Sequence, residues 1–382
     1  MQDRSLCRVN LAHDHCVPRK NADALVLRHT SGVSTPVGFD SDRVGHWRRP
    51  CYHLRSAVQT KPPYIVSAVA LGLSACGGPQ SALVTAGRDA AQIADLLTVM
   101  TVGTLIVWAA VVAIAVYTIQ VDEAHSRRAA SLLIIGGGVV APTTVLGALI
   151  AYGMPLVPTV LAIPDDGAAV RVTAKQWWWR FEYLTPAGPV ETANELRLPR
   201  GDRIALELGS PDVIHSFWVP SLAGKMDMIP GRVTRLAVEP TQVGTFRGTC
   251  AEYCGASHAL MAFSVIVMEP ADFRRWLEDQ TRPALTPTDS LAGRGQTAFI
   301  ANGCTACHTV RGTSAAGRIG PDLTHVGSRR SIAADTMPND PSALARWIAR
   351  TDQIKPGVHM PAFRSLPADE LSALAAYLSS LK

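Results

Sequence analysis

The sequence predicts a multidomain membrane protein with three parts: a two-helix transmembrane hairpin, an all-β sandwich and an all-α C-terminal domain. Three observations support this fold class. Long stretches without any charged residue lie between residues 96 and 164. Short alternating runs, punctuated by Gly and Pro, fill residues 168–269. The last part of the chain has helical periodicity around a Cys-x2-Cys-His motif that begins at Cys304.

The composition already excludes some classes of protein. The chain has 382 residues, enough for two or three domains, and 47% of them are hydrophobic but only 18% are charged. In soluble proteins about a quarter of the residues are charged. Because the share is lower here, we expect part of this chain to lie in lipid. The net charge of +5 is spread out, with no stripe of basic and aromatic residues. We therefore expect no nucleic-acid partner.

The N-terminal residues differ from the rest of the chain. Residues 1–57 are polar, rich in Arg and His and without a sustained period. They are either a disordered extension or sequence upstream of the true start, which we place near Val58. Residues 58–76 have a charged flank, a short apolar run and small residues, as a secretory signal does. The segment ends in Leu-Ser-Ala-Cys and resembles a bacterial lipoprotein box, in which Cys76 is lipidated.

Two charge-free stretches, residues 96–121 and 129–164, are long enough to cross a bilayer. A transmembrane helix needs about 20 apolar residues. We expect helices near 95–119 and 131–154, within a hairpin that spans residues 90–158. Two buried helices of a soluble core are the alternative, which the length of both stretches disfavours.

The loop between the two spans fixes the predicted orientation. It contains Arg127 and Arg128 beside Asp122 and Glu123. Positively charged loops tend to stay in the cytoplasm. Everything after about residue 155 is then expected on the outer face of a bacterial cell membrane, in a multi-pass protein.

Residues 165–280 predict a small antiparallel sandwich or barrel. A short amphipathic helix at 270–280 closes this domain. The Pro-rich residues 281–289 predict a linker before the C-terminal domain of residues 290–382. The expected strands lie in the runs Val170–Val172, Trp177–Tyr183, Leu196–Leu198, Ile204–Leu208, Val213–Val219, Val233–Val238, Thr245–Gly248 and Ala262–Val267.

One short segment of the β domain gathers metal ligands in the pattern Cys-x3-Cys-x3-His-x2-Met. Its members are Cys250, Cys254, His258 and Met261. Sulfur and imidazole together favour copper, and a mononuclear blue-copper site needs only one Cys. The second Cys would let two thiolates bridge two copper ions, with one His for each metal. The second imidazole must come from elsewhere, and His215 is the best candidate. Zinc is the competing metal, but the usual His-x3–5-His pair is missing.

This segment resembles the dinuclear CuA centre of cytochrome c oxidase subunit II. The resemblance runs from about Ala90 to Glu269 and includes an aromatic run, Gln176–Tyr183, and the segment Gly224–Arg232. It implies a cupredoxin Greek-key fold for residues 165–280.

The resemblance also implies a role for individual residues. Cys250 and Cys254 would bridge two copper ions, and His215 and His258 would each bind one. Weak axial ligands would be Met261 and the backbone carbonyl of Glu252. The side chain of Glu252 would reach a magnesium site shared with subunit I, and Trp177 would receive electrons from cytochrome c. No acidic residue lies within 129–164, so we assign no residue to proton uptake.

The motif Cys304-Thr305-Ala306-Cys307-His308 predicts covalent attachment of a c-type heme. Both thiols would add to the heme vinyl groups, and His308 would be an axial ligand. A thioredoxin-like motif would need a βαβ context, which is absent. Residues 290–382 resemble a class I cytochrome c, which implies a Met as the sixth ligand. Met360 has the expected context, and Met337 and His359 are the alternatives.

These resemblances imply subunit II of a bacterial respiratory heme–copper oxidase with a fused cytochrome c. Electrons would pass from the heme to the coppers and on to subunit I, where O2 is reduced to water and protons are translocated. The implied partners are subunits I and III, a cytochrome c or upstream cytochrome complex as donor, and the bilayer. Two alternatives remain: the CuA subunit of a nitrogen-oxide reductase system, and a copper-delivery or assembly protein.

Overall fold

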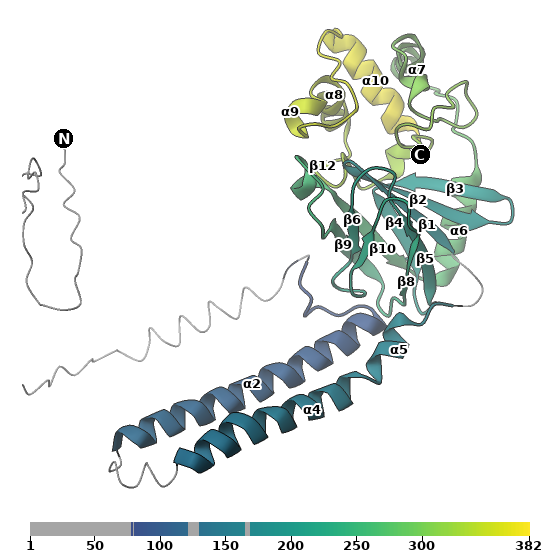
Figure 1. Cartoon of the computed structure of the whole chain (residues 1–382). Helices are drawn as coiled ribbons and strands as arrows, with labels where there is room; N and C mark the ends of the chain where they lie inside the picture. The colour runs from purple at the N-terminus through teal and green to yellow at the C-terminus, as the bar shows by residue number, and fades with distance from the viewer. Residues whose placement is uncertain (1–77, 79, 121–129, 165–168) are drawn as a thin grey trace, which may run out of the picture. The chain divides into compact units, whose positions relative to one another are not determined.

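The computed structural model describes residues 78, 80–120, 130–164 and 169–382 (Figure 1). Several predictions fall outside these residues. They are the N-terminal extension, the signal segment with Cys76, and the loop that carries Arg127 and Arg128.

Two helical spans form a hairpin whose arms run in opposite directions (Figure 1). The first is α2 (Arg88–Gln120). The second combines a π-helical stretch, η1 (Leu133–Val140), with α4 (Ala141–Gly153) and α5 (Leu156–Leu161). Both spans are long and apolar enough to cross a membrane. At 1.5 Å per residue, the 33 residues of α2 measure about 50 Å, more than the ~30 Å of a hydrocarbon core.

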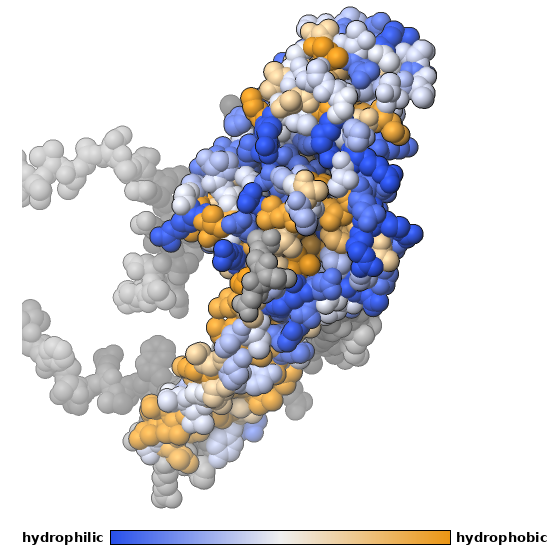
Figure 2. Space-filling view, turned by 90° about the vertical axis from the view of Figure 1, so that its right-hand side faces the viewer, coloured by the Kyte–Doolittle hydropathy of each residue, from blue (hydrophilic) through white to orange (hydrophobic). Residues whose placement is uncertain are grey.

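The side chains of this hairpin suit an apolar solvent. Figure 2 shows apolar surface gathered along these helices. The hydroxyls of Thr98, Thr101 and Thr104 each donate to a carbonyl four residues earlier, at 2.8 Å. A hydroxyl in lipid needs such a partner, because no water is there to replace it.

Residues at the start of α2 form an ion pair and hydrogen bonds with the β domain. Asp89 is 1% exposed, and Arg203 donates to both of its carboxylate oxygens at 3.2 and 3.3 Å. The backbone N–H of Ala86 donates to the carbonyl of Ser221 at 2.7 Å. A buried carboxylate needs such a partner, so removal of Arg203 would leave an unpaired buried charge.

The β domain is a sandwich of two five-stranded sheets. One has the order β3-β2-β1-β5-β8 and the other β4-β10-β9-β6-β7. The strands are β1 (Val170–Lys175), β2 (Trp178–Thr185), β3 (Gly188–Ala193), β4 (Glu195–Pro199), β5 (Ile204–Gly209), β6 (His215–Trp218), β7 (Met226–Met228), β8 (Thr234–Val238), β9 (Gly244–Cys250) and β10 (Ala262–Met268).

The sequence predicted an antiparallel sandwich or barrel, and most strand pairs of the sandwich are antiparallel, but two pairs are parallel. These are β1 with β5 and β4 with β10. The single residue Asn194 separates β3 from β4 and has a φ of 60°. Asn tolerates this left-handed conformation better than most residues. The chain switches sheets there, and β4 then lies beside β10 in the same direction.

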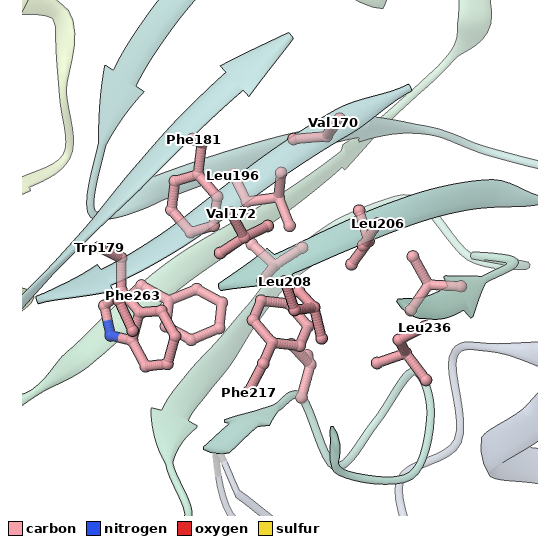
Figure 3. Close-up of a cluster of buried hydrophobic side chains, with 14 of the residues drawn as sticks. Val170, Val172, Trp179, Phe181, Leu196, Leu206, Leu208, Phe217, Leu236 and Phe263 are labelled. Carbon is pink, nitrogen blue, oxygen red and sulfur yellow. The ribbon is translucent and has the colours of Figure 1, made fainter. Parts of the chain in front are cut away.

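Aromatic residues fill the space between the sheets (Figure 3). Trp179, Phe181, Phe217 and Phe263 are each at most 1% exposed. The ring centroids of Trp179 and Phe263 lie 4.8 Å apart, and those of Phe217 and Phe263 lie 5.0 Å apart. Burial of one such side chain stabilises the fold by about 1.5–3 kcal/mol. This core therefore keeps the ends of the strands in place.

The C-terminal part is helical, and α7 and α10 cross closely. A Cβ atom at Gly295 would lie 1.9 Å from the carbonyl oxygen of Ala373, so only glycine fits at the crossing. Asp289 and Asp340 cap α7 and α8 through backbone N–H groups. The remaining elements of the chain are η2 (His258–Leu260), in the loop between β9 and β10, α6 (Pro270–Thr281), α7 (Ser290–Ala301), η3 (Cys304–Ala306), η4 (Val326–Ser328), β11 (Ser331–Ile332), β12 (Met337–Pro338), α8 (Pro341–Ala349), α9 (Thr351–Ile354) and α10 (Ala368–Ser380).

The Pro-rich segment between α6 and α7 is hydrogen-bonded to the C-terminal domain. The N–H of Ala284 donates to the carbonyl of Arg311 at 2.8 Å. Arg311 in turn donates to the carbonyl of Gln280 at 2.7 Å, and His325 Nε2 lies 3.1 Å from the carbonyl of Arg282. The connection therefore has hydrogen bonds on both sides of Pro283.

Candidate copper and heme sites

The loop between β9 and β10 carries the predicted metal ligands. Cys250 is the last residue of β9, and its N–H donates to the carbonyl of Met261 at 3.1 Å, which closes the base of the loop. Strand β6 pairs with β9 so that Phe217 faces Cys250. His215, the first residue of β6, therefore lies beside the start of the loop.

The side chains of this loop and of β6 form one sulfur–imidazole cluster. The Sγ atoms of Cys250 and Cys254 lie 3.8 Å apart. His215 Nδ1 is 3.8 Å from the sulfur of Cys250, and His258 Nδ1 is 3.5 Å from that of Cys254. The thioether of Met261 lies 3.8 Å from Cys254 Sγ. The structure thus brings together all five predicted side-chain ligands.

The donor set and its burial fit a soft metal. Each thiol has its own imidazole neighbour, so nitrogen donors lie on both sides of the sulfur pair. The carbonyl of Glu252 points at the sulfur of Cys250 at 3.1 Å, while its side chain is exposed. Cys250, Cys254 and His215 are each at most 4% exposed. Thiolate, imidazole and thioether donors in a dry pocket favour copper.

The two thiols have opposite shifts in pKa. Their hydrogen bond lowers the pKa of Cys250 and raises that of Cys254. The S–H of one cysteine stabilises a thiolate on the other, whereas two adjacent thiolates would repel each other as like charges. A bound cation removes this conflict, because both thiols then ionise toward the metal.

Asp212 orients His215, a role that sequence reasoning missed. Its Oδ1 lies 2.9 Å from His215 Nε2, which leaves Nδ1 for the sulfur side. Hydrogen bonds from His215 and from the N–H groups of Gln176 and Val213 outweigh burial and hold the pKa of Asp212 at about 2. Such a carboxylate is a common outer partner of a ligating imidazole. The only signal in the sequence was the spacing Asp-x2-His.

The three consecutive tryptophans have different environments. Trp179 belongs to the sandwich core and is fully buried. Trp178 is half-buried, with the Arg180 guanidinium 5.1 Å from its ring centroid. Trp177 is 6% exposed and donates from Nε1 to the carbonyl of Cys254 at 3.0 Å. Trp179 also donates from Nε1 to the carbonyl of Met261, at 3.3 Å. Both buried tryptophans are therefore hydrogen-bonded to the sulfur loop.

A second site surrounds a cavity of about 400 Å³, which is lined by the C-terminal domain and also by β-domain residues that include Trp177 and Trp178. Cys304, Cys307 and His308 line it. His308 Nδ1 is 2.8 Å from the carbonyl of Pro321, so its Nε2 is left for the cavity. Burial lowers the pKa of His308, which keeps the ring neutral and able to ligate a metal. These residues fit a covalently attached heme.

The cavity distinguishes among the three candidates for the sixth ligand. Met360 lines it and is partly buried in the helical core. His359 also lines it but is exposed. Met337, in β12, lines a different cavity, together with Arg247 and Asp335. Of the three candidates, Met360 is therefore the one that both lines this cavity and is partly buried.

The fold and these two sites define a class of protein: a β sandwich with a sulfur-rich copper loop, joined to a helical domain of the cytochrome c type. Family comparisons agree with this description. Residues 185–269 match the periplasmic domain of cytochrome c oxidase subunit II. Residues 292–382 match cytochrome c.

Curated relatives extend the comparison beyond these domains. The chain is 38% identical over 220 residues to cytochrome c oxidase subunit 2 of Alkalihalophilus pseudofirmus, covering 58% of this chain and 63% of the relative. It is 32% identical over 258 residues to cytochrome c oxidase subunit 2 of Bacillus sp. strain PS3, covering 61% of this chain and 71% of the relative. The chain belongs to the cytochrome c oxidase subunit 2 family.

The match does not cover these relatives completely. The chain spans 63% of the length of the relatives from A. pseudofirmus and Bacillus subtilis. Among solved structures, it is 30% identical to the periplasmic domain of subunit II of cytochrome oxidase from Bradyrhizobium japonicum, with a TM-score of 0.30. That similarity covers 31% of this chain and 97% of the solved one.

Proposed function

We propose that this chain is the electron-transfer subunit of a bacterial respiratory cytochrome c oxidase. When bound, the heme and the copper pair each supply a one-electron carrier. Cys304, Cys307, His308 and Met360 would hold the heme. The remaining part of the oxidase, where O2 is reduced to water and protons are translocated, would lie in subunit I, with subunit III as a further partner.

The observation that carries this proposal is the sulfur–imidazole cluster. Two thiols 3.8 Å apart, each with its own imidazole, support a dinuclear copper site in which Cys250 and Cys254 bridge the metals. His215 and His258 would bind one copper each, and Met261 and the Glu252 carbonyl would be weak axial ligands. A rigid cluster changes little when its charge changes, which favours rapid electron transfer.

The burial of these ligands argues against a copper-delivery protein. Delivery requires ligands that exchange with a partner at the surface. Here His215 and Met261 are 0% exposed, and the imidazole of His215 is fixed by Asp212. A second buried cofactor site in the same chain supports a relay rather than a carrier.

The proposed arrangement in the cell places the hairpin in the bacterial membrane and both cofactor domains on its outer face. The exposed side chain of Glu252 is available for a magnesium ion at the contact with subunit I. The electron donor would be a cytochrome c or an upstream cytochrome complex.

The test is spectroscopic and uses the full chain, produced in a host that attaches c-type heme and then supplied with copper. We expect an electron paramagnetic resonance signal from one electron shared by two coppers, beside the optical bands of a low-spin c-type heme. A signal from a single copper, or binding of zinc in preference to copper, would contradict the proposal.

A further inference from the structure

The guanidinium of Arg203 lies where three parts of the chain meet. Arg203 immediately precedes β5 in the β domain, and its side chain is mostly buried. All three side-chain nitrogens donate hydrogen bonds, and the acceptors belong to the start of α2, the end of α5 and the residue after β8. We call this group of residues the joint: Arg203, Asp89, Glu239, and Thr159, Val160 and Ala162 with their carbonyls.

The joint holds the first membrane span through its first turn. Asp89 lies in this turn, and Arg203 donates to its two carboxylate oxygens at 3.2 and 3.3 Å. The backbone N–H of Arg88 donates to the carbonyl of Glu239 at 3.0 Å, which adds a second contact. An acid is favoured at the N-terminus of a helix. Because Asp89 is buried, this pair also differs from surface ion pairs, which contribute little.

The same guanidinium holds the outer end of the second span. Arg203 donates to the carbonyls of Thr159 at 3.1 Å, Val160 at 3.4 Å and Ala162 at 3.1 Å. The last carbonyls of a helix have no partner within that helix, and a cation near them interacts favourably with the helix dipole. Arg203 therefore supplies α5 with partners that its own backbone does not provide.

Glu239 balances the charges of the joint. Its carboxylate lies 3.5 Å from the guanidinium of Arg203 and 3.1 Å from that of Arg88. Two guanidiniums therefore face two carboxylates, Asp89 and Glu239. Removal of Arg203 would leave both carboxylates without the partner that they share, and a buried carboxylate without a partner is costly.

Together, the contacts to α2 and α5 restrict how the β domain can move relative to the hairpin. A domain attached at one point can swing about it, because a few backbone dihedral angles absorb the motion. Contacts to both arms through one planar group remove this freedom. A guanidinium suits this role because its rigid fork of N–H groups holds several acceptors in fixed directions, whereas a Lys ammonium is a point charge on a flexible stem.

We propose that Arg203 is a positioning residue for electron delivery, which holds the copper loop of the β domain in one orientation relative to the membrane and at a constant distance from subunit I. The step that it serves transfers one electron: the copper pair is oxidised, the acceptor in subunit I is reduced, and no bond forms or breaks. This inference rests on the proposed function, but the orientation is measurable without subunit I.

The alternative is that Arg203 only stabilises the fold. Its loss would then lower the free energy of unfolding, but every molecule that stays folded would keep the orientation of its copper loop. A measurement of orientation in the folded chain therefore distinguishes the two roles, which a measurement of stability alone does not.

The first experiment uses the full chain, loaded with heme and copper, in stacked lipid bilayers without subunit I. The electron paramagnetic resonance spectrum of the copper site is recorded while the bilayers are turned in the magnetic field. We expect the spectrum to change strongly with the angle, because all β domains share one orientation. A two-copper signal that does not change with the angle would overturn the inference.

Two variants and a matched control assign this orientation to Arg203. Arg203→Lys keeps the charge but loses the fork, and Arg203→Gln loses both. We expect each to keep the two-copper spectrum in frozen solution and to lose most of its dependence on the angle. The control is Arg200→Gln, in the same connection between β4 and β5, because Arg200 pairs with Glu269 where both side chains are about half-exposed. Unchanged angle dependence in both Arg203 variants would overturn the inference.

The second experiment follows electrons in the complex with subunit I after flash reduction of the heme. Arg203→Lys should keep the heme-to-copper rate, because both cofactor sites follow the joint in the chain. It should slow the transfer from copper to subunit I by about tenfold or more, since misplacement by about 1 Å is costly in rate. An unchanged rate to subunit I would overturn the inference. Absence of a two-copper signal in the original chain would instead contradict the proposed function.

Discussion

The Nε2 atom of His215 lies 2.9 Å from a carboxylate oxygen of Asp212. This hydrogen bond fixes the imidazole so that Nδ1 faces the sulfur of Cys250. Burial lowers the pKa of His215, but the hydrogen bonds to Asp212 and Cys250 outweigh burial and raise the pKa to about 8. The carboxylate therefore raises the basicity of the nitrogen that would bind metal.

The variant Asp212→Asn should weaken copper binding by about 10–100-fold, the usual effect of removing the outer partner of a ligating His. Competition with a copper chelator measures this change. The control is Asp227→Asn, because Asp227 is an exposed acid on the neighbouring strand that pairs with Lys225 and Ser216. Equal affinities for the two variants would show that Asp212 does not orient the ligand.

The assignment of the sixth heme ligand is tested by two matched changes. Met360→Leu should convert the low-spin heme to a five-coordinate, high-spin form, because Leu has no donor atom. Met337→Leu should leave the spectrum unchanged, since Met337 lines another cavity. Optical spectra of both variants decide this. A low-spin spectrum of Met360→Leu would show that another residue is the sixth ligand of the heme. The variant His359→Ala would then test whether the neighbouring imidazole is that ligand.

The crossing of α7 and α10 gives a prediction about stability. Gly295→Ala should strongly destabilise the C-terminal domain, because its Cβ would overlap the carbonyl oxygen of Ala373. Gly293→Ala, in the same helix, has nothing within 4 Å of the new Cβ. It should stabilise the domain by up to about 1 kcal/mol, since Ala favours helix over Gly. Thermal unfolding followed at the heme compares them, and similar midpoints would contradict the predicted close crossing.

Lys355 should make stability depend on pH. Burial lowers the pKa of Lys355 from 10.5 to about 7 in the folded chain. Between pH 7 and 10.5 the unfolded chain binds the extra proton, so the free energy of unfolding should rise with pH in this window. Below pH 7 the full cost of burying the ammonium applies.

Denaturant unfolding of the copper-free chain at several pH values measures this dependence. Lys355→Met should remove the rise, and Lys225→Met should keep it, because Lys225 is half-exposed at the surface. If the free energy of unfolding of Lys355→Met rises with pH by the same amount, titratable groups other than Lys355 cause the rise.

The sequence indicated both candidate cofactor sites, because such sites depend on residue type and local spacing. Cys250, Cys254, His258 and Met261 lie on one loop, and Cys304 to His308 form a contiguous motif. The two long apolar spans were also visible from composition alone. In each case the signal lies within a few consecutive residues.

The contacts that the sequence did not predict follow no periodic pattern. Asp212 acts through a polar hydrogen bond without any periodic pattern, and Lys355 reaches Trp177 across 178 positions in the chain. The change of sheet at Asn194, which makes β4 parallel to β10, depends on one φ angle. Such features depend on how surfaces meet in three dimensions, which hydrophobic periodicity does not encode.

The most direct test of the relay follows one electron through the full chain loaded with heme and copper. A flash-generated one-electron reductant reduces the heme, and absorbance then reports heme oxidation and copper reduction together. A relay within one chain predicts equal rates for the two changes, independent of protein concentration. A rate that rises in proportion to concentration, or a heme that stays reduced beside oxidised copper, would contradict it.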